Sequence, residues 1–280
     1  MGKLFKNLKP YWKSVLMIVV LLMVQAFCDL SLPQYTSDII DTGIQNSGVE
    51  HILPEKITAE EFQNAQLFMT ADEQKTWQDA YNGDGDILDR NDFSKKDLEQ
   101  FDSDLIVPIL LNYQMSMMSE DGFREMLMQQ QQGNPQAAEQ LKTMSIADIG
   151  KSMGVTLTPF ERTEEDDDGN ETTVTCVDVR PLFAAMQEAG QFTEETRSEM
   201  RSQLETMLDT MGESLVQSMG IAYAVQCDQA AGLDTDKIQT NYLWAAGGKM
   251  IAIAFAMMAV TICISYVAAR VGAGVGRDLR

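Results

Sequence analysis

The chain is poor in the side chains on which most enzyme and metal chemistry depends. It contains a single histidine, His51, in 280 residues. Histidine is the commonest general base and one of the commonest ligands of structural and catalytic metals. We therefore expect neither a histidine-based metal site nor a catalytic triad on this chain alone.

Cysteine is almost as scarce. The four cysteines form no C-x-x-C pair and no Cys/His metal spacing, so no metal site is expected. Cys28 and Cys263 lie in apolar runs near the two ends. Cys176 and Cys227 lie in the acidic middle of the chain, where they could form a disulfide if that part faces an oxidising space. One has a strand-like context and the other a helical one, so the sequence leaves this pairing open.

A nucleotide-binding loop is also missing. The pattern G-x-x-x-x-G-K-[ST] occurs nowhere, and Gly272, Gly274 and Gly276 lack the glycine spacing and the preceding strand of a dinucleotide-binding turn. The acidic stretch 82–93 lacks the sixth-position glycine and twelfth-position glutamate of an EF-hand, so a solvated turn is favoured over a looser calcium site. We expect no enzyme activity and no cofactor on this chain alone.

Basic residues are few beside acidic ones, and the imbalance is concentrated in the middle of the chain. The chain has 21 basic and 42 acidic residues, a formal net charge of −21. Residues 42–240 hold 13 of the basic and 38 of the acidic residues, a net charge of −25. Such a segment repels phosphate backbones, so nucleic acid is excluded as a partner. An exposed, soluble domain is the simplest explanation of this charge.

Two long apolar runs stand near the ends of the sequence. The first is Ser14–Leu32, and the second, Met250–Ala269, has twenty residues without a charge. Twenty helical residues span ~30 Å, the thickness of a bilayer's hydrocarbon core. Basic residues lie on the terminal side of each run: Lys3, Lys6, Lys9 and Lys13, then Arg270, Arg277 and Arg280. Because basic residues favour the cytoplasmic side, we expect a multi-pass cytoplasmic-membrane protein with both termini inside and the middle outside.

The first run has two features that need explanation. A basic start followed by an apolar run also describes a signal peptide, but no small-x-small cleavage site follows, so a retained membrane helix is favoured. Gln25 and Asp29 are polar residues within or near this run. Such residues usually face protein or water rather than lipid, although a position of Asp29 at the outer interface explains it equally well.

The middle of the chain has the mixed patterning of a folded domain. Capping boxes at Thr58–Glu61 and Thr70–Glu73 predict two helix starts, and Asn82–Asp86 predicts a turn between helices. Further helices are predicted over 105–118, 123–132 and 192–231, the last one closed by Gly232. The Val- and Thr-rich stretches 155–162 and 172–180 predict a β-hairpin with an acidic loop.

Together these patterns predict a mainly α membrane protein. Two long transmembrane helices flank a mostly helical extracellular domain with a small β-hairpin. The predicted parts are 1–47, the basic N-terminus and first helix; 48–237, the acidic insert; and 238–280, the second helix with its cytoplasmic extension. We expect the second helix to run unbroken from about Tyr242 past its glycines, of which Gly272 and Gly276 share a face.

Both ends resemble one family. S-L-P-Q-Y-T-S-D-I-I-D-T-G-I, from Ser31 to Ile44, resembles the end of the first transmembrane helix of bacterial type I ABC exporters. I-Q-T-N-Y-L-W-A-A-G-G-K-M, from Ile238 to Met250, is similar to the start of their second helix. A-A-R-V-G-A-G-V-G-R-D-L-R, from Ala268 to Arg280, is similar to its cytoplasmic extension. The insert matches no motif shared by the superfamily, although some multidrug-type exporters carry a large external insert here.

The resemblance implies that this chain is the first third of a half-transporter with six helices and a nucleotide-binding domain. ATP and Mg²⁺ would bind in that parent, which would pair with a second half-transporter. The implied partners of this chain are lipid, the other helices and the nucleotide-binding domain. Gln25 and Asp29 become candidates for the transport pathway. The implied cytoplasmic extension comprises Arg270, Gly272, Gly276, Arg277, Asp278 and Arg280.

Two other functions remain open from the sequence. A two-helix sensor also places an external ligand-binding domain between two spans, but it usually continues into a signalling helix through a linker. A glycine-rich, arginine-bearing segment follows here instead, which favours the exporter. The third possibility is a membrane-tethered acidic module that binds cations or basic peptides.

Overall fold

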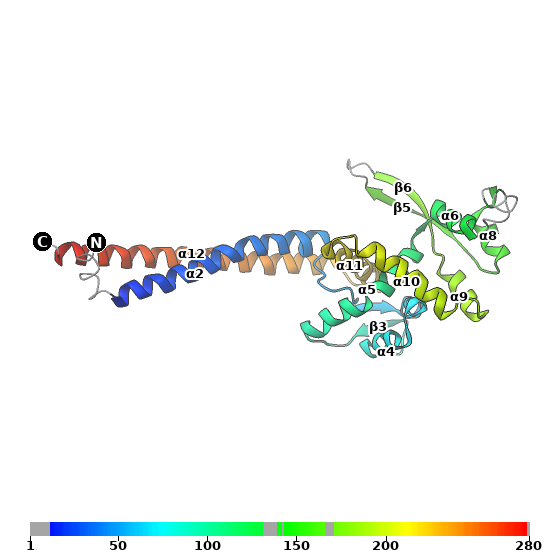
Figure 1. The fold of residues 1–280 in the computed structure, drawn as a ribbon, viewed down its shortest axis with the longest axis horizontal. Helices are drawn as coiled ribbons and strands as arrows, with labels where there is room; N and C mark the ends of the chain where they lie inside the picture. The colour runs from blue at the N-terminus through cyan, green and yellow to red at the C-terminus, as the bar shows by residue number, and fades with distance from the viewer. Residues whose placement is uncertain (1–11, 131–138, 140, 142, 166–170, 279–280) are drawn as a thin grey trace. The chain divides into compact units, whose positions relative to one another are not determined.

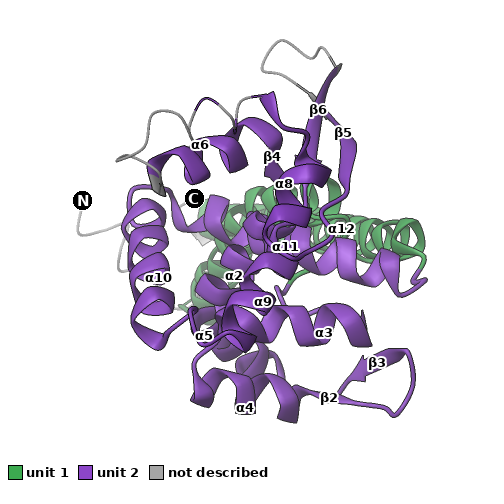
Figure 2. Ribbon diagram, turned by 90° about the vertical axis from the view of Figure 1, so that its right-hand side faces the viewer, with its two compact units in different colours: residues 1–50, 234–280 green, residues 51–233 purple. Residues whose placement is uncertain are grey.

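The computed structural model describes residues 12–130, 139, 141, 143–165 and 171–278. It is mostly helical, at 73%, and divides into two compact units (Figure 2). Unit 1 comprises Met1–Glu50 and Asp234–Arg280, and unit 2 comprises His51–Leu233. Lys3, Lys6, Lys9, Arg280 and the acidic loop residues 166–170 lie outside the described residues.

Unit 1 consists of two long helices. α2 spans Trp12–Asp38 and continues into the π-helical segment η2, Ile39–Gln45, while α12 spans Thr235–Asp278. They pack side by side in opposite directions (Figure 1). Both are long and apolar enough to cross a membrane. The 44 residues of α12 include all three C-terminal glycines, which confirms the prediction of one unbroken helix.

A close contact joins the ends of the two helices within unit 1. Gln239 on α12 donates its side-chain amide to the Gly43 carbonyl at 2.9 Å. Gly48 has a positive φ of 80°, and an added Cβ would lie 2.9 Å from the Gln239 Cα. Only glycine combines this backbone conformation with this spacing. The predicted end of the first helix at 46–48 is therefore also the point where the chain passes against α12.

Unit 2 carries the remaining elements. In chain order they are β1 (Lys56–Thr58), α3 (Ala59–Ala65), the 3-10 turn η3 (Gln66–Phe68), α4 (Ala71–Ala80), β2 (Tyr81–Asn82), β3 (Ile87–Arg90), α5 (Lys95–Ser116), β4 (Met118–Ser119), α6 (Glu120–Gln130), α8 (Ile146–Ser152), β5 (Pro159–Glu165), β6 (Glu171–Val177), α9 (Arg180–Glu188), α10 (Glu194–Leu208) and α11 (Glu213–Ala230). The helix predicted at 105–118 is confirmed as far as Ser116, where α5 ends, since Met118 begins β4 instead. The helix predicted at 123–132 is confirmed as far as Gln130, where α6 ends, and 131–132 lie outside the described residues. The stretch 192–231 is instead two helices, separated at 209–212, and Gly232 ends the second with a φ of 82°.

Two small antiparallel sheets cross-link the helices. The predicted hairpin is confirmed as β5 and β6, with Phe160 opposite Cys176, and β4 adds a third strand beside β6. The second sheet, in the order β1-β3-β2, was not predicted. The turn at 82–86 therefore joins two strands rather than two helices. Strands of two to four residues are too short to show an alternating pattern, which explains the error.

The core of unit 2 is aromatic and well buried. The Phe68 ring meets those of Phe183 and Phe192 edge to face, with centroids 5.5 Å and 6.0 Å apart. Trp77 is fully buried and donates its indole N–H to the Phe62 carbonyl at 3.1 Å. Offset and edge-to-face aromatic contacts add to the stabilisation from burial alone. Unit 2 thus has a hydrophobic core of its own.

Candidate functional site

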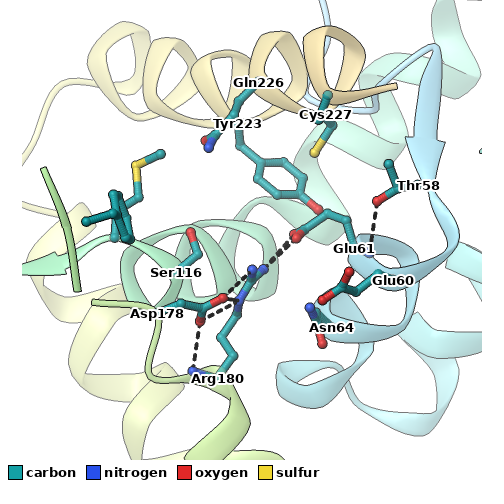
Figure 3. A pocket seen from close by; sticks show the side chains of 13 residues that line it. Thr58, Glu60, Glu61, Asn64, Ser116, Asp178, Arg180, Tyr223, Gln226 and Cys227 are labelled. Atoms are coloured by element: carbon teal, nitrogen blue, oxygen red, sulfur yellow. Dashed lines mark hydrogen bonds and ion pairs between the residues drawn. The ribbon is translucent and has the colours of Figure 1, made fainter. Parts of the chain in front are cut away.

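A cavity of about 410 Å³ lies in unit 2 and brings together five separate stretches of the chain. Its walls come from the β1–α3 junction, the end of α5, β5, the start of α9 and α11 (Figure 3). None of these stretches has a sequence pattern that predicts a site. The cavity forms because the two sheets and α11 bring distant polar residues to one place.

A buried guanidinium group lies at the cavity wall between two carboxylates. Arg180 is 7% exposed, and its Nη1 donates to the two Glu61 oxygens at 2.8 Å and 2.7 Å. Its Nε and Nη2 donate to Asp178 at 2.9 Å and 2.8 Å (Figure 3). Every guanidinium nitrogen is therefore bonded to a carboxylate. Burial lowers the pKa of Arg180, but hydrogen bonds and charges from Asp178 and Glu61 outweigh this effect, so the net shift is upward.

The helix cap at Thr58 helps to position Glu61 beside Arg180 and Asp178. The Thr58 hydroxyl caps α3 by accepting the Glu61 N–H at 3.2 Å, which fixes Glu61 in the first turn. The Glu61 carboxylate does not complete the predicted capping box. It accepts instead from Asn112 at 2.8 Å and from Arg180, because buried partners that include a charged group outweigh the single backbone amide of Thr58. The predicted box at Thr58 is thus only half formed, whereas that at Thr70 is complete.

Tyr223 and Cys227 on α11 form the opposite wall (Figure 3). Burial raises the pKa of both side chains, with the nearby Cys227 adding to the effect at Tyr223 and Glu61 adding to it at Cys227. The thiol is therefore protonated at neutral pH and unsuited to nucleophilic catalysis. The buried Tyr223 hydroxyl group makes no well-formed hydrogen bond to any described residue, and the adjacent Cys227 thiol is only a weak partner.

The ionisable groups of the cavity carry an excess of negative charge. Glu60, Glu61 and Asp178 contribute three carboxylates, and Arg180 contributes the only cation among the lining residues. Among the described residues, no three His, Cys, Asp or Glu side chains are grouped so as to hold a metal ion. His51 does not line this cavity but pairs with Asp102 at 2.7 Å. The arrangement is suited to binding, with no activated nucleophile beside it.

The transport-pathway and helix-extension residues predicted from sequence belong to the helices of unit 1, and none of them lines this cavity. Gln25 is half-buried and Asp29 exposed on α2. On α12, four members of the predicted extension are exposed: Arg270, Gly272, Gly276 and Arg277. A Cβ added at Gly272 or Gly276 would meet nothing within 4 Å among the described residues. Asp278 ends α12, and Arg280 lies outside the described residues.

The suggested disulfide between Cys176 and Cys227 is not formed. Both side chains are buried thiols outside any disulfide, one on β6 and the other on α11. Cys227 faces the cavity beside Tyr223, and Cys176 lies at a strand position opposite Ser119 and Phe160. The sequence analysis named Cys227 and the capping box Thr58–Glu61, but it did not bring them together in a site, and it missed the other cavity residues. The available signal was the segment Asp178-Val179-Arg180, which places one acidic and one basic residue where β6 ends and α9 begins.

Comparisons with known proteins identified no relative of this chain. No protein-family model, curated protein or solved structure matches this chain.

Proposed function

We propose that this chain forms part of the transmembrane subunit of an ATP-driven exporter. The observation that carries the proposal is the length of α12. Its 44 residues extend ~66 Å, whereas the apolar run Met250–Ala269 accounts for only ~30 Å. The helix therefore extends beyond the hydrocarbon core by ~22 Å before Met250 and by ~14 Å after Ala269. A membrane anchor needs no such projection, but an exporter needs long helices that reach its nucleotide-binding domains.

The surface of the helix pair supports further membrane partners. Large apolar side chains are exposed along both helices: Leu16, Val20, Phe27 and Leu30 on α2, and Ile251, Phe255, Ile262 and Tyr266 on α12. Exposed apolar area of this extent needs lipid or other helices around it. Gly272 and Gly276 lie one turn apart, and a Cβ at either would have no described neighbour within 4 Å, which suits the close approach of another helix. Lipid, further helices and a second half-transporter are the proposed partners.

The proposed topology gives a labelling prediction. In a background with the exposed Cys263 changed to Ala, an impermeant maleimide applied to intact cells should label Ser202→Cys, which lies on the surface of α10, and leave Ser14→Cys unlabelled. The reason is the excess of basic residues on the terminal sides of both helices. Permeabilised cells should label both variants. Labelling of Ser14→Cys alone in intact cells contradicts the topology.

If the chain belongs to an exporter, substitutions on the α12 face that carries Gly272 and Gly276 should impair transport but not ATP hydrolysis. In the transporter that contains this chain, Gly272→Leu or Gly276→Leu should abolish transport while ATP hydrolysis continues. Because no described residue lies within 4 Å of a Cβ added at either position, we attribute the effect to helices that pack there in the assembled transporter. Ala273→Leu, at an exposed neighbouring position on another face, is the matched control. Wild-type transport in both glycine variants at equal expression contradicts close packing there.

A second candidate function is a membrane receptor with an external ligand-binding domain. The cavity in unit 2 favours it, because small-molecule sites are concave and combine apolar walls with a few convergent polar groups. The two candidates differ in their dependence on ATP. A receptor needs no nucleotide-binding domain in the same polypeptide or complex, so co-purification of the chain with an ATPase favours the exporter.

A further inference from the structure

We infer that the cavity in unit 2 binds a small organic molecule that carries a protonated primary or secondary amine. Four features of the cavity lead to this ligand class. They are the charge of its walls, the saturation of its one cation, an unpartnered buried hydroxyl group and the adjacent apolar side chains. Binding at this cavity does not depend on what the two long helices do, so this inference and the proposed export can fail independently.

The charge of the cavity selects a cation. Arg180 neutralises only part of the charge of Glu61 and Asp178, and Glu60 adds another carboxylate at the exposed side. Glu60 has no salt-bridge partner among the described residues, whereas Glu61 and Asp178 are both paired. The surrounding acidic segment, with its net charge of −25 over residues 42–240, adds to the negative potential. An incoming cation is therefore attracted at long range and gains a carboxylate at the cavity.

The same contacts exclude an anionic ligand. A carboxylate or phosphate ligand needs a guanidinium edge that is free to donate to it. Each nitrogen of Arg180 already donates to Glu61 or Asp178. An anion would have to displace one of these carboxylates and leave it close by. The arginine thus holds the cavity walls in place and is not available as a ligand-binding cation.

Tyr223 supplies the observation that points to a ligand. It is only 2% exposed, it lines the cavity, and its hydroxyl group has no well-formed partner among the described residues. A buried polar group without a partner is costly, and native structures rarely retain one without a reason. The hydroxyl oxygen can accept a hydrogen bond from an ammonium N–H. Figure 3 shows the Tyr223 ring extending from α11 with its hydroxyl group toward the Glu61 side chain.

The remaining lining residues indicate what the rest of the ligand, beyond its amine group, should be like. The Phe160 ring and the Met117 side chain give the cavity apolar walls, and the Tyr223 ring adds an aromatic face. Aromatic faces attract cations and apolar groups alike. Asn64 and Gln226 offer side-chain carbonyl oxygens, which suit an amine with N–H donors better than a quaternary ammonium ion. The volume of about 410 Å³ lies in the range of small-molecule sites.

The test uses 2-phenylethylamine as the probe, with the full chain in lipid nanodiscs and binding followed by isothermal titration calorimetry. We expect saturable binding of the amine at pH 7. Binding of the neutral 2-phenylethanol should be about ten-fold weaker, because it lacks the charge-assisted contacts, and 3-phenylpropionate should not bind. Equal affinity for the amine and the alcohol, or no saturable binding of the amine up to millimolar concentration, overturns the inference.

Two variants locate the binding in this cavity. Tyr223→Phe removes only the hydroxyl group, whose one neighbour among the described residues is the weak partner Cys227, so it should weaken amine binding about ten-fold without lowering thermal stability. Glu60→Gln should weaken it about three-fold, with a larger effect at low salt, because Glu60 is exposed. Glu199→Gln, an exposed glutamate on α10 outside the cavity, is the matched control and should change nothing. Unchanged affinity in both cavity variants overturns the assignment of the site.

Discussion

Replacing Arg180 with methionine should lower the free energy of unfolding of unit 2 by about 3 kcal/mol, the lower end of the cost of breaking a buried ion pair. Methionine fills much of the arginine stem's volume but leaves Glu61 and Asp178 without their cation. Glu61 retains Asn112 as a partner, and the Asp178 side chain is 35% exposed and keeps some water. These two facts place the expected cost at the lower end rather than higher.

The measurement uses the fluorescence of Trp77 as a reporter of unit 2. Trp77 is fully buried there, whereas Trp12 and Trp244 are exposed on the helices of unit 1. A reference chain with Trp12→Phe and Trp244→Phe isolates the signal, and urea titration gives the unfolding free energy. A loss below ~0.5 kcal/mol, the range of ordinary surface substitutions, contradicts the structural role of Arg180.

Two companion variants separate charge from geometry. Arg180→Lys keeps the positive charge but loses the planar fork that reaches both carboxylates, so an intermediate loss is expected. A triple variant with Arg180→Met, Glu61→Gln and Asp178→Asn removes the uncompensated charges and should recover part of the loss. No recovery would mean that packing of the arginine stem, and not the unpaired carboxylates, causes the loss.

The sequence predicted the parts of the fold that depend on long or local patterns. A charge-free run of twenty residues is enough to indicate a membrane-length helix, and α12 contains that run without a break. The Thr70 capping box also formed as predicted, since its hydrogen bonds involve neighbours three residues apart. In that box Glu73 accepts from Arg201 as well, at 2.7 Å. The Glu73 carboxylate can therefore complete the capping box and bind its distant partner Arg201 at the same time.

The errors arose where tertiary contacts outweigh local signals. Glu61 has the same local pattern as Glu73, but its carboxylate turns to Arg180, which is 119 residues away in the sequence. The strands β1, β2 and β3 have too few residues to show a period, and only their pairing with one another defines them. The cavity was missed for the same reason. No spacing rule links Thr58, Ser116, Phe160 and Tyr223 before the chain has folded.

Raising the pH from 4 to 7.5 should destabilise unit 2 by about 2–3 kcal/mol through Asp228 alone, and Asp228→Asn should remove this dependence. Asp228 lies on α11 and is fully buried. One of its oxygens accepts the Lys56 N–H at 2.7 Å, and the other has no hydrogen-bond partner in the described part of the chain. Burial raises the pKa of its carboxyl group from 3.8 to about 6. The Lys56 N–H opposes this shift, and the nearby Glu55 charge adds to it.

The sign follows from proton binding. Because the folded-state pKa of this acid is raised, the folded state holds its proton more tightly than the unfolded chain between pH ~4 and ~6. The stabilisation is complete below the unfolded pKa and is lost as the pH rises through about 6. A shift of about two units corresponds to about 3 kcal/mol. Asparagine cannot ionise, so its unfolding free energy should lack this component of the slope.

The comparison of two pH values makes the test robust. The amide oxygen of Asp228→Asn can still accept the Lys56 N–H, but its NH2 group occupies the side that has no partner, which carries a fixed cost. That cost is the same at pH 4 and at pH 7.5, so it cancels in the difference between them. In the Trp77 reporter chain, the variant should gain about 2–3 kcal/mol relative to the parent between these pH values. Parallel stability profiles for the two chains would show that Asp228 remains ionised in the folded state down to pH 4, and that its burial is compensated by groups other than a bound proton.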